Sequence, residues 1–272
     1  MKRAHNRAIS ASEDATLLFD IGNTHTHIGI AMGNKIQEQF NLRTQIWTNG
    51  AGAEKLKSRI AKRTITGVAI ASVVPFATIG VRRFIRTCGL PTPFLLTAKT
   101  VASIGIDYPN PDSIGPDRLA NAIAARAQVG APVIVVDFGT AVTFDVVNKA
   151  GNYVGGIIAP GLAVMTDYLH EKTALLPRIE IRETRAVIGK NTEQAMLSGA
   201  VHGYRGMIRE LIGKLKKELK ADTLPVLATG GYASLMAKGL PEITAVEPLL
   251  TLTGLLIASR EFRFNVERSR GK

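Results

Sequence analysis

The segments LLFDIGNTHTHIGIAM (residues 17–32) and VIVVDFGTAVTFDVVN (residues 133–148) repeat one pattern. In each, an apolar run reaches an aspartate, a glycine-containing turn follows, and the chain then becomes apolar again. Asp20 in the first copy corresponds to Asp137 in the second, an offset of 137 − 20 = 117 residues that also aligns the turn glycines. Because apolar runs around a short turn predict paired antiparallel strands, the two copies predict a duplicated architecture of two lobes.

Alternating strands and helices predict that both lobes belong to the α/β class. The periodicity predicts strands over 67–74 and 93–97, helices over 53–62, 77–88 and 117–128, a helix ending before Pro177, a long helical region over 191–219, and a strand, Gly-Gly turn and helix start over 224–237. We expect the active site in the cleft between the lobes. The expected divisions are a flexible N-terminal extension (1–15), an N-terminal lobe (16–128), a C-terminal lobe (129–262) and a basic tail (263–272).

The composition argues against several protein classes. Apolar residues make up 46% of the 272 residues, which is enough for a sizeable core. The single cysteine, Cys88, excludes an internal disulfide framework and fits a reducing compartment. No apolar run is long enough to span a bilayer, and residues 1–15 lack the apolar segment of a secretory signal. We therefore expect a cytoplasmic protein without a membrane anchor.

The formal net charge of +12 raises the question of an anionic partner. The basic residues are dispersed, however, and no basic run is interleaved with aromatic residues. In the predicted helix over 204–220, apolar residues recur at helical spacing and the lysines lie mostly on the other face. This pattern is typical of a solvated helix face, so the sequence argues against a nucleic-acid partner, although the charge can attract nucleotides.

The two aspartate–glycine turns carry the strongest chemical signal. Glycine lets backbone N–H groups approach a phosphate closely, and a carboxylate beside it can hold the cation that neutralises the phosphate. A single copy would be an ordinary hairpin, but repetition of the acid on an apolar strand favours a nucleotide site gripped from both lobes. The sequence has no Walker A pattern and no G-x-G-x-x-G pattern, which argues against P-loop and Rossmann binding.

Two weaker signals accompany the turns. Asp117 and Arg118 open the predicted helix over 117–128. The acid is either a residue that interacts favourably with the helix dipole, or a general base beside a cationic substrate anchor. The pair Gly230–Gly231 permits close approach to a flat ligand, or is a plain strand-to-helix turn. The five histidines form no H-x-x-x-H or H-E-x-x-H pair, which argues against a histidine metal site.

Together, these and several other motifs resemble the type III pantothenate kinases over about residues 17–257. The motifs that carry the resemblance are DIGNT, YPNPDSIGPDR, DFGTAVTFD, GGIIAPGL, KTALLP, GKNTEQAMLSG and TGGYASL…LTLTGL, in this order. The family belongs to the acetate and sugar kinase/Hsp70/actin superfamily. The resemblance implies two ribonuclease-H-like lobes with ATP between them, as the internal repeat indicates independently.

The resemblance also implies the reaction and the site. The enzyme would use ATP to phosphorylate pantothenate to 4'-phosphopantothenate, the first step of coenzyme A biosynthesis, as a cytoplasmic homodimer. Asp117 would accept the proton of the substrate hydroxyl, Asp20 would support Mg²⁺ through water, and Asp137 would hold K⁺ or NH₄⁺. The implied ATP-binding residues are Asp20, Ile21, Gly22, Asn23, Thr24, His25, Thr26, His27, Thr140, Gly230 and Gly231. The implied pantothenate-binding residues are Tyr108, Gly115, Pro116, Asp117, Arg118 and Thr192.

The sequence departs from the family pattern at a few positions. Pro116 stands where alanine is common and removes a backbone N–H, and His25 and His27 lie in the first phosphate loop. Two other interpretations stay open: a non-catalytic accessory or regulatory relative, and a superfamily kinase that acts on another alcohol. The presence of Asp20, Asp117 and Asp137 favours an enzyme.

Overall fold

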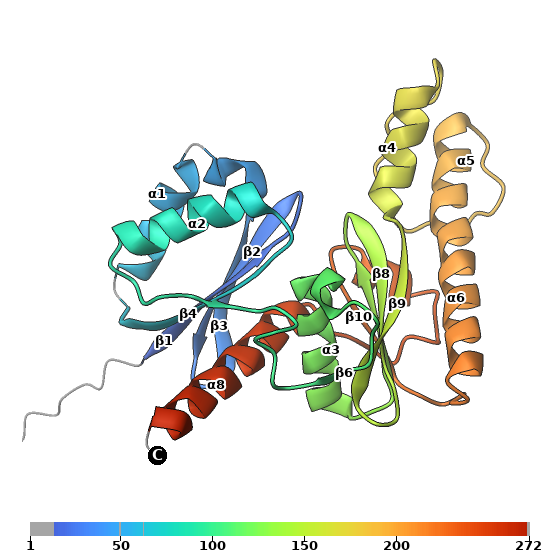
Figure 1. Ribbon diagram of the computed structural model, residues 1–272. Helices are drawn as coiled ribbons and strands as arrows, with labels where there is room; N and C mark the ends of the chain where they lie inside the picture. The colour runs from blue at the N-terminus through green and yellow to red at the C-terminus, as the bar shows by residue number, and fades with distance from the viewer. Residues whose placement is uncertain (1–13, 49, 62, 271–272) are drawn as a thin grey trace, which may run out of the picture.

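The computed structural model describes residues 14–48, 50–61 and 63–270, and the predicted N-terminal extension lies outside these residues up to position 13. Figure 1 shows two sheets with a pair of long helices between them. In the described part of the chain, no helix is both long enough and apolar enough to cross a membrane.

The first sheet has the strand order β3–β2–β1–β4–β5. Its strands are β1 (Ala15–Ile21), β2 (His25–Met32), β3 (Lys35–Arg43), β4 (Ile65–Ser72) and β5 (Phe94–Leu95). The first three strands form an antiparallel meander, and β4 and β5 continue the sheet in parallel with β1. The apolar run of β1 therefore lies in the middle of the sheet, where its even and odd residues are both covered.

The second sheet repeats this arrangement, in the order β6–β9–β8–β7–β10–β11. Its strands are β6 (Gly105–Ile106), β7 (Val133–Phe138), β8 (Ala141–Val147), β9 (Asn152–Pro160), β10 (Val226–Thr229) and β11 (Ala245–Val246). Again three antiparallel strands are followed by two strands parallel to the first, and β6 adds an edge strand from the chain before α3. The duplicated α/β architecture predicted from the repeat is confirmed.

The helices cover the sheets in layers (Figure 1). They are α1 (Ala51–Ile60), α2 (Pro75–Thr87), α3 (Pro116–Val129), α4 (Leu162–Lys172), α5 (Thr192–Ser198), α6 (Tyr204–Glu218), α7 (Ala233–Ala237) and α8 (Leu250–Arg270). Short 3₁₀ turns span Thr44–Trp47 and Pro111–Ser113, and a π-helical turn spans Gly199–Gly203. Helix α8 continues through most of the segment expected to be a basic tail, and residues 271–272 lie outside the described residues.

Helices α3 and α8 form the layer that both lobes share. One buried cluster joins Leu18 of the first sheet, Val135 of the second sheet, and apolar residues of both helices. Residues 119–125 of α3 are all buried, as expected of a helix enclosed on every side. The alanine-rich sequence of α3 suits this position because small side chains let neighbouring elements approach closely.

The two helices approach each other closely at Gly254. A Cβ atom there would lie 1.8 Å from the carbonyl oxygen of Ala120, which is far inside van der Waals contact. We predict that Gly254→Ala lowers the free energy of unfolding by about 1–3 kcal/mol, because α8 must move away from α3. The matched control is Gly213→Ala in α6, where a Cβ would meet no atom within 4 Å.

The control should be neutral or more stable by up to ~1 kcal/mol, since alanine has the higher helix propensity. Thermal unfolding followed by circular dichroism measures both changes. Equal stability of Gly254→Ala and the parent protein would contradict the proposed close packing.

Candidate active site

The first candidate group is the carboxylate of Asp20, near the end of β1. Asp20 is partly buried and is paired with His27 in β2 and Ala71 in β4. The N–H of Gly22 donates to the carbonyl oxygen of His25 at 3.0 Å, which closes the turn after β1. A Cβ on Gly22 would lie 3.1 Å from that oxygen, so the tight turn favours glycine.

The second candidate group, Asp137, occupies the corresponding place in the second sheet. It is paired with Thr143 in β8 and Thr229 in β10, and the turn after β7 is closed by a similar backbone hydrogen bond. The two turns meet directly, because the hydroxyl oxygens of Thr24 and Thr140 lie 3.0 Å apart. The repeated turns of the two lobes therefore face each other, as the sequence repeat predicts.

The third candidate group, Asp117, lies in the first turn of α3. Helix α3 begins at Pro116 after Gly115, and the fixed φ of proline suits the first helical position. An oxygen of Asp117 accepts a hydrogen bond from the backbone N–H of Arg118 at 2.9 Å. Burial raises the pKa of Asp117, whereas this hydrogen bond and the charge of Arg118 oppose the rise. The carboxyl group is therefore a stronger base than an exposed aspartate.

Burial and neighbouring carboxylates shift the pKa values of Asp20 and Asp137. Burial, followed by the charges of Asp117 and Asp137, raises the pKa of Asp20 well above its usual range. Burial raises the pKa of Asp137 to about 6, a hydrogen bond from Asn121 opposes this shift, and the charge of Asp117 adds to it. One acid each from β1, α3 and β7 thus contributes to a common negative potential, which a bound cation would relieve.

The donor set fits hard cations. Carboxylate oxygens are the ligands preferred by Mg²⁺, and the cluster potential supplies the attraction. Within residues 14–48, 50–61 and 63–270, no three histidine, cysteine, aspartate or glutamate side chains gather as a complete metal site. A cation beside Asp20 or Asp137 would therefore complete its coordination with water, backbone carbonyl or phosphate oxygens.

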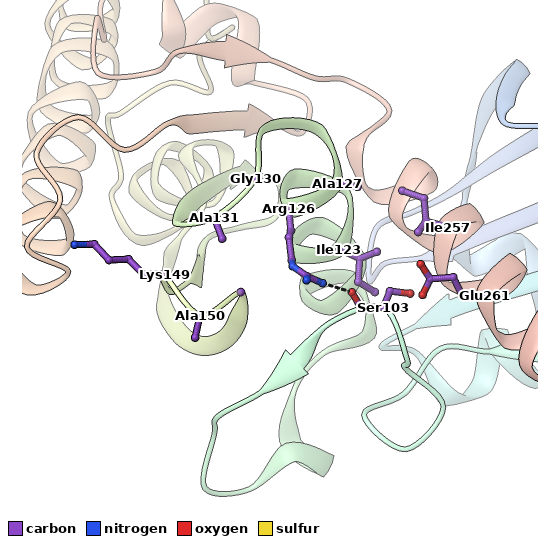
Figure 2. Close-up of a pocket in the computed structure, with 11 residues that line it drawn as sticks. Ser103, Ile123, Arg126, Ala127, Gly130, Ala131, Lys149, Ala150, Ile257 and Glu261 are labelled. Carbon is purple, nitrogen blue, oxygen red and sulfur yellow. Dashed lines mark hydrogen bonds between the residues drawn. The ribbon is translucent and has the colours of Figure 1, made fainter.

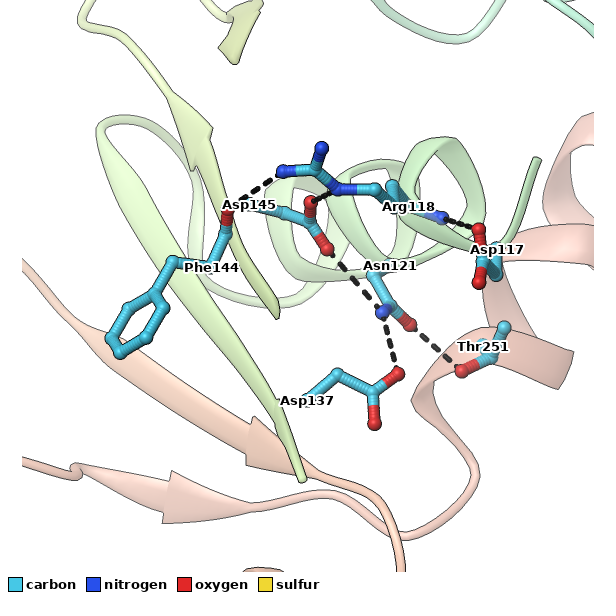
Figure 3. A network of polar contacts seen from close by, with 7 residues as sticks. All are labelled: Asp117, Arg118, Asn121, Asp137, Phe144, Asp145 and Thr251. Carbon is cyan, nitrogen blue, oxygen red and sulfur yellow. Dashed lines mark hydrogen bonds and ion pairs between the residues drawn. The ribbon is translucent and has the colours of Figure 1, made fainter. Parts of the chain in front are cut away.

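Arg118 is held by a buried acid that the sequence analysis did not select. Its Nε donates to Asp145 at 2.6 Å, and its Nη2 donates to the carbonyl oxygen of Phe144 at 2.9 Å (Figure 3). Asp145 is fully buried in β8, and the exposed fraction of the Arg118 side chain is 14%. The signal was present in the sequence: an acid within the apolar run TFDVV needs a partner when it is buried.

Tyr108, Tyr153 and Gly156 form a wall beside Arg118. Tyr108 packs edge-on against Tyr153 at 6.2 Å between ring centroids, and the guanidinium of Arg118 lies 5.8 Å from the ring of Tyr153. A Cβ on Gly156 would lie 1.6 Å from the carbonyl oxygen of Phe144 and 2.8 Å from Arg118 Nη2. Gly156, the second glycine of GGIIAPGL, therefore leaves room for the guanidinium of Arg118 beside β8.

The other predicted binding residues differ in their surroundings. Gly230 has a left-handed φ of +89°, and a Cβ there would lie 2.5 Å from Asp137 Oδ1, so Gly230 packs against the acid. A Cβ on Gly231 would meet no atom within 4 Å, which leaves space for a ligand. Thr192 is exposed at the start of α5, and the described residues show no hydrogen bond that joins its side chain to Asp117 or Arg118.

The two histidines of the first turn lie side by side, with ring centroids 6.5 Å apart. Nδ1 of His27 and Oδ1 of Asn41 are 2.8 Å apart, so the nitrogen carries the proton and donates to the amide oxygen. Burial lowers the pKa of His27, so its ring is neutral at pH 7. The role of both histidines in binding ATP stays a prediction.

A separate cavity of about 500 Å³ lies at the other end of α3 (Figure 2). It is bounded by the last turn of α3, the turn between β8 and β9, and α8. Arg126 closes one side by donating from Nη1 to the carbonyl oxygen of Ser103 at 2.7 Å. None of the predicted site residues lines this cavity, so it is not part of the candidate active site.

Comparison with known proteins places the chain in a family. A family model described as type III pantothenate kinase matches residues 16–214. The type III pantothenate kinase of Akkermansia muciniphila is 43% identical over 244 residues, which are 89% of this chain and 97% of that protein. The type III pantothenate kinase of Methylacidiphilum infernorum is 41% identical over 240 residues, which are 88% of this chain and 86% of that protein.

Solved structures resemble the fold at much lower identity. A Campylobacter jejuni protein assigned to the Baf family of transcriptional activators has a TM-score of 0.56 at 18% identity, covering 90% of this chain and 98% of its own. A Listeria monocytogenes protein assigned as an N-acetylmannosamine kinase has a TM-score of 0.53 at 14% identity. The match covers 92% of this chain and 99% of that protein. These likenesses confirm the predicted two-lobed, ribonuclease-H-like fold and carry no further functional argument.

The raised pKa of Asp137 predicts a pH-dependent cost in stability. The folded protein holds this proton up to about pH 6, whereas the unfolded chain releases it near the ordinary value of 3.8. Stability should therefore fall as the pH rises from ~4 to ~6 and stay reduced above this range. Asp137→Asn, which can still accept from Asn121, should exceed the parent protein in stability by up to ~3 kcal/mol at pH 7.5.

The difference in stability between Asp137→Asn and the parent protein should disappear as the pH approaches ~4. Thermal unfolding in EDTA, with tetramethylammonium as the only added cation, measures both proteins across this range. A stability difference that does not change with pH would show that the carboxyl group of Asp137 titrates normally.

Proposed function

Because this chain belongs to the type III pantothenate kinase family, we propose that it transfers the γ-phosphoryl group of ATP to the terminal hydroxyl of pantothenate. The products are 4'-phosphopantothenate and ADP, in the first step of coenzyme A biosynthesis. The observation that carries the proposal is the convergence of Asp20, Asp117 and Asp137 beside two facing turns. Phosphoryl transfer depends mainly on positioning and charge neutralisation, which this arrangement can supply.

The two turns would hold the phosphate groups of ATP. Asn23 and Thr24 would present backbone N–H groups on one side, and Thr140 would present its hydroxyl on the other. The N–H of Gly22 already donates to His25, so Gly22 would contribute the tight turn itself. The hydrogen bond between Thr24 and Thr140 would give way to bonds with phosphate oxygens, since both hydroxyls are exposed. The open space at Gly231 would accommodate the adenosine.

Two carboxylates would hold the cations that the phosphates require. Asp20 would bind the water shell of Mg²⁺, and Asp137 would bind a monovalent ion, K⁺ or NH₄⁺. These ions neutralise negative charge on the phosphates when bound. The raised pKa values of both acids support this assignment, because a cation is the partner that would keep them ionised.

Asp117 would act as the general base. The hydroxyl oxygen of pantothenate bonds to the γ-phosphorus, the bond from that phosphorus to the leaving oxygen of ADP breaks, and the hydroxyl proton passes to Asp117. The position of Asp117 in the first turn of α3 keeps its charge favourable near the positive end of the helix dipole.

Arg118 would anchor the pantothenate carboxylate. Its Nε donates to Asp145 and its Nη2 donates to the carbonyl oxygen of Phe144, so the guanidinium is held in place. Nη1 would then donate to the carboxylate of pantothenate. Tyr108 and Gly115 to Pro116 would complete the pocket around the substrate. Pro116 would contribute only its carbonyl group and ring, because it lacks an N–H.

The central test is a coupled ADP-release assay with pantothenate, Mg²⁺ and K⁺. We predict that Asp117→Asn lowers kcat by ~10²–10⁴-fold, the usual contribution of a general base. Its melting temperature should stay near that of the parent protein, because asparagine can still accept the N–H of Arg118. Omission of both K⁺ and NH₄⁺ should lower the activity of the parent protein.

Near-normal turnover by folded Asp117→Asn would show that the base is assigned wrongly. Turnover with a sugar but not with pantothenate would favour a superfamily kinase for another alcohol. Absence of turnover with every alcohol would favour a non-catalytic regulatory relative.

A homodimer is part of this proposal. Exposed apolar side chains gather on α4 and the segments around it, where a partner could cover them. They are Ile158, Val164, Met165, Tyr168, Leu169, Leu175, Val187 and Ile188, with exposed fractions from 42% to 90%. Thr192 follows this segment, so its predicted contact with pantothenate would form near the interface.

A cytoplasmic location is also part of the proposal. The single cysteine, Cys88, is a free thiol, which is compatible with the reducing conditions of the cytoplasm.

We predict that Leu169→Glu converts the dimer into a monomer, because the interface would bury an unpaired charge. The dimer dissociation constant should rise at least ~100-fold, about 3 kcal/mol. Light scattering coupled to size-exclusion chromatography measures the mass. The control is Ile79→Glu on α2, which is 62% exposed on the other lobe and should stay dimeric. A Leu169→Glu dimer as stable as the parent would place the interface elsewhere.

A further inference from the structure

Asn121 connects more of the candidate site than any residue selected from the sequence. It lies one turn after Asp117 on α3 and is fully buried. Its Nδ2 donates to Asp137 Oδ2 at 3.1 Å and, over a longer contact of 3.5 Å, to Asp145 Oδ2. Its Oδ1 accepts from the hydroxyl of Thr251 at 2.8 Å, as Figure 3 shows.

The chemistry of these partners fixes which way the amide points. An ionised carboxylate only accepts hydrogen bonds, so the NH₂ group of Asn121 must face Asp137 and Asp145. The amide oxygen then faces Thr251, whose hydroxyl can donate. A flipped amide would place its oxygen against two carboxylates and lose both bonds. The rotamer is therefore determined by three partners from three different elements.

The two acids have different tasks in the proposed reaction. Asp137 would hold the monovalent cation, and Asp145 holds Arg118 through a 2.6 Å contact with Nε. Asp145 thus uses one oxygen for Arg118 and presents the other to Asn121. A change in the position of the Asn121 amide would move both carboxylates together.

Thr251 ties this network to the rest of the molecule. It lies in the first turn of α8, which packs along α3 and also against β1, β2 and β4 of the first sheet. The hydroxyl that orients the amide of Asn121 therefore comes from a helix that also packs against β1, the strand that carries Asp20. The described contacts thus link α8 to the acids of the second lobe through Asn121.

We propose that Asn121 is a positioning residue that sets the cation ligand Asp137 and, through Asp145, the substrate anchor Arg118, with Thr251 fixing its amide. This inference rests on the proposed function, which assigns a cation to Asp137 and pantothenate to Arg118. It follows that affinity for the cation and affinity for pantothenate depend on the same side chain and weaken together when that side chain is disturbed.

The test uses Thr251→Val, which keeps the shape of the side chain and removes only the hydroxyl. Loss of one hydrogen bond should raise both the K⁺ concentration for half-maximal activity and the pantothenate dissociation constant by about fivefold. Asn121→Ala, which removes the amide and both of its hydrogen bonds to the acids, should raise both by more than about tenfold. Thr251→Ser should restore both values.

Two readouts do not depend on turnover. Isothermal titration calorimetry measures pantothenate binding, and the rise in melting temperature on adding KCl, compared with choline chloride, measures cation binding. The control is Thr253→Val, which makes the same change on the same helix at a residue outside the network and should match the parent protein. If Asn121→Ala does not fold, Thr251→Val with its serine rescue carries the test alone.

A joint loss of K⁺ and pantothenate affinity, rescued by serine, supports the inference. Parent-like values for both ligands in folded Thr251→Val, or a loss confined to one ligand, would overturn it. A parent protein that binds neither pantothenate nor K⁺ would instead contradict the proposed function, and the inference would fail with it.

Discussion

The candidate site depends on placing three carboxylates, Asp20, Asp117 and Asp137, near one another where the two lobes meet. Burial raises the pKa values of Asp20 and Asp137, and the charge of Asp117 adds to both shifts, so the ligand-free fold carries an electrostatic cost at neutral pH. Such a cost persists only where the surrounding structure holds the groups in place. In this chain, the buried strands β1 and β7 and the start of α3 supply that support. In the proposed reaction, bound cations would relieve this repulsion, so acids can lie beside phosphate groups.

Duplication explains how the acids come to face each other. Each sheet has three antiparallel strands followed by two parallel ones, so the first strand and its acid lie in the middle of both. Helices α3 and α8 lie between the sheets and share one apolar cluster with both. The close approach at Gly254 and the bond from Thr251 to Asn121 bring these helices together near the acids. The same two helices thus join the lobes and carry the polar contacts beside the acids.

Much of this arrangement could be predicted from the sequence, because the decisive signals are local. The repeat around Asp20 and Asp137 predicted the lobes, and the helix over 117–128 is confirmed as α3. The acid in TFDVV indicates that Asp145 needs a partner, but the contacts of Asn121 and Thr251 could not be predicted in this way. Thr251 meets Asn121 across 130 positions of sequence, and an asparagine in an alanine-rich helix carries no local pattern that indicates its partners. Long-range polar contacts follow from the packing of α8 on α3, which periodicity does not specify.

The most direct measurement is a crystal structure with pantothenate, Mg²⁺, K⁺ and a non-hydrolysable ATP analogue. The account predicts triphosphate between the turns of Thr24 and Thr140, K⁺ at Asp137, and the terminal hydroxyl of pantothenate within hydrogen-bonding distance of Asp117. The pantothenate carboxylate should lie on Arg118, which Asp145 still holds. Pantothenate bound outside the cleft, or with its hydroxyl directed away from Asp117, would contradict the account.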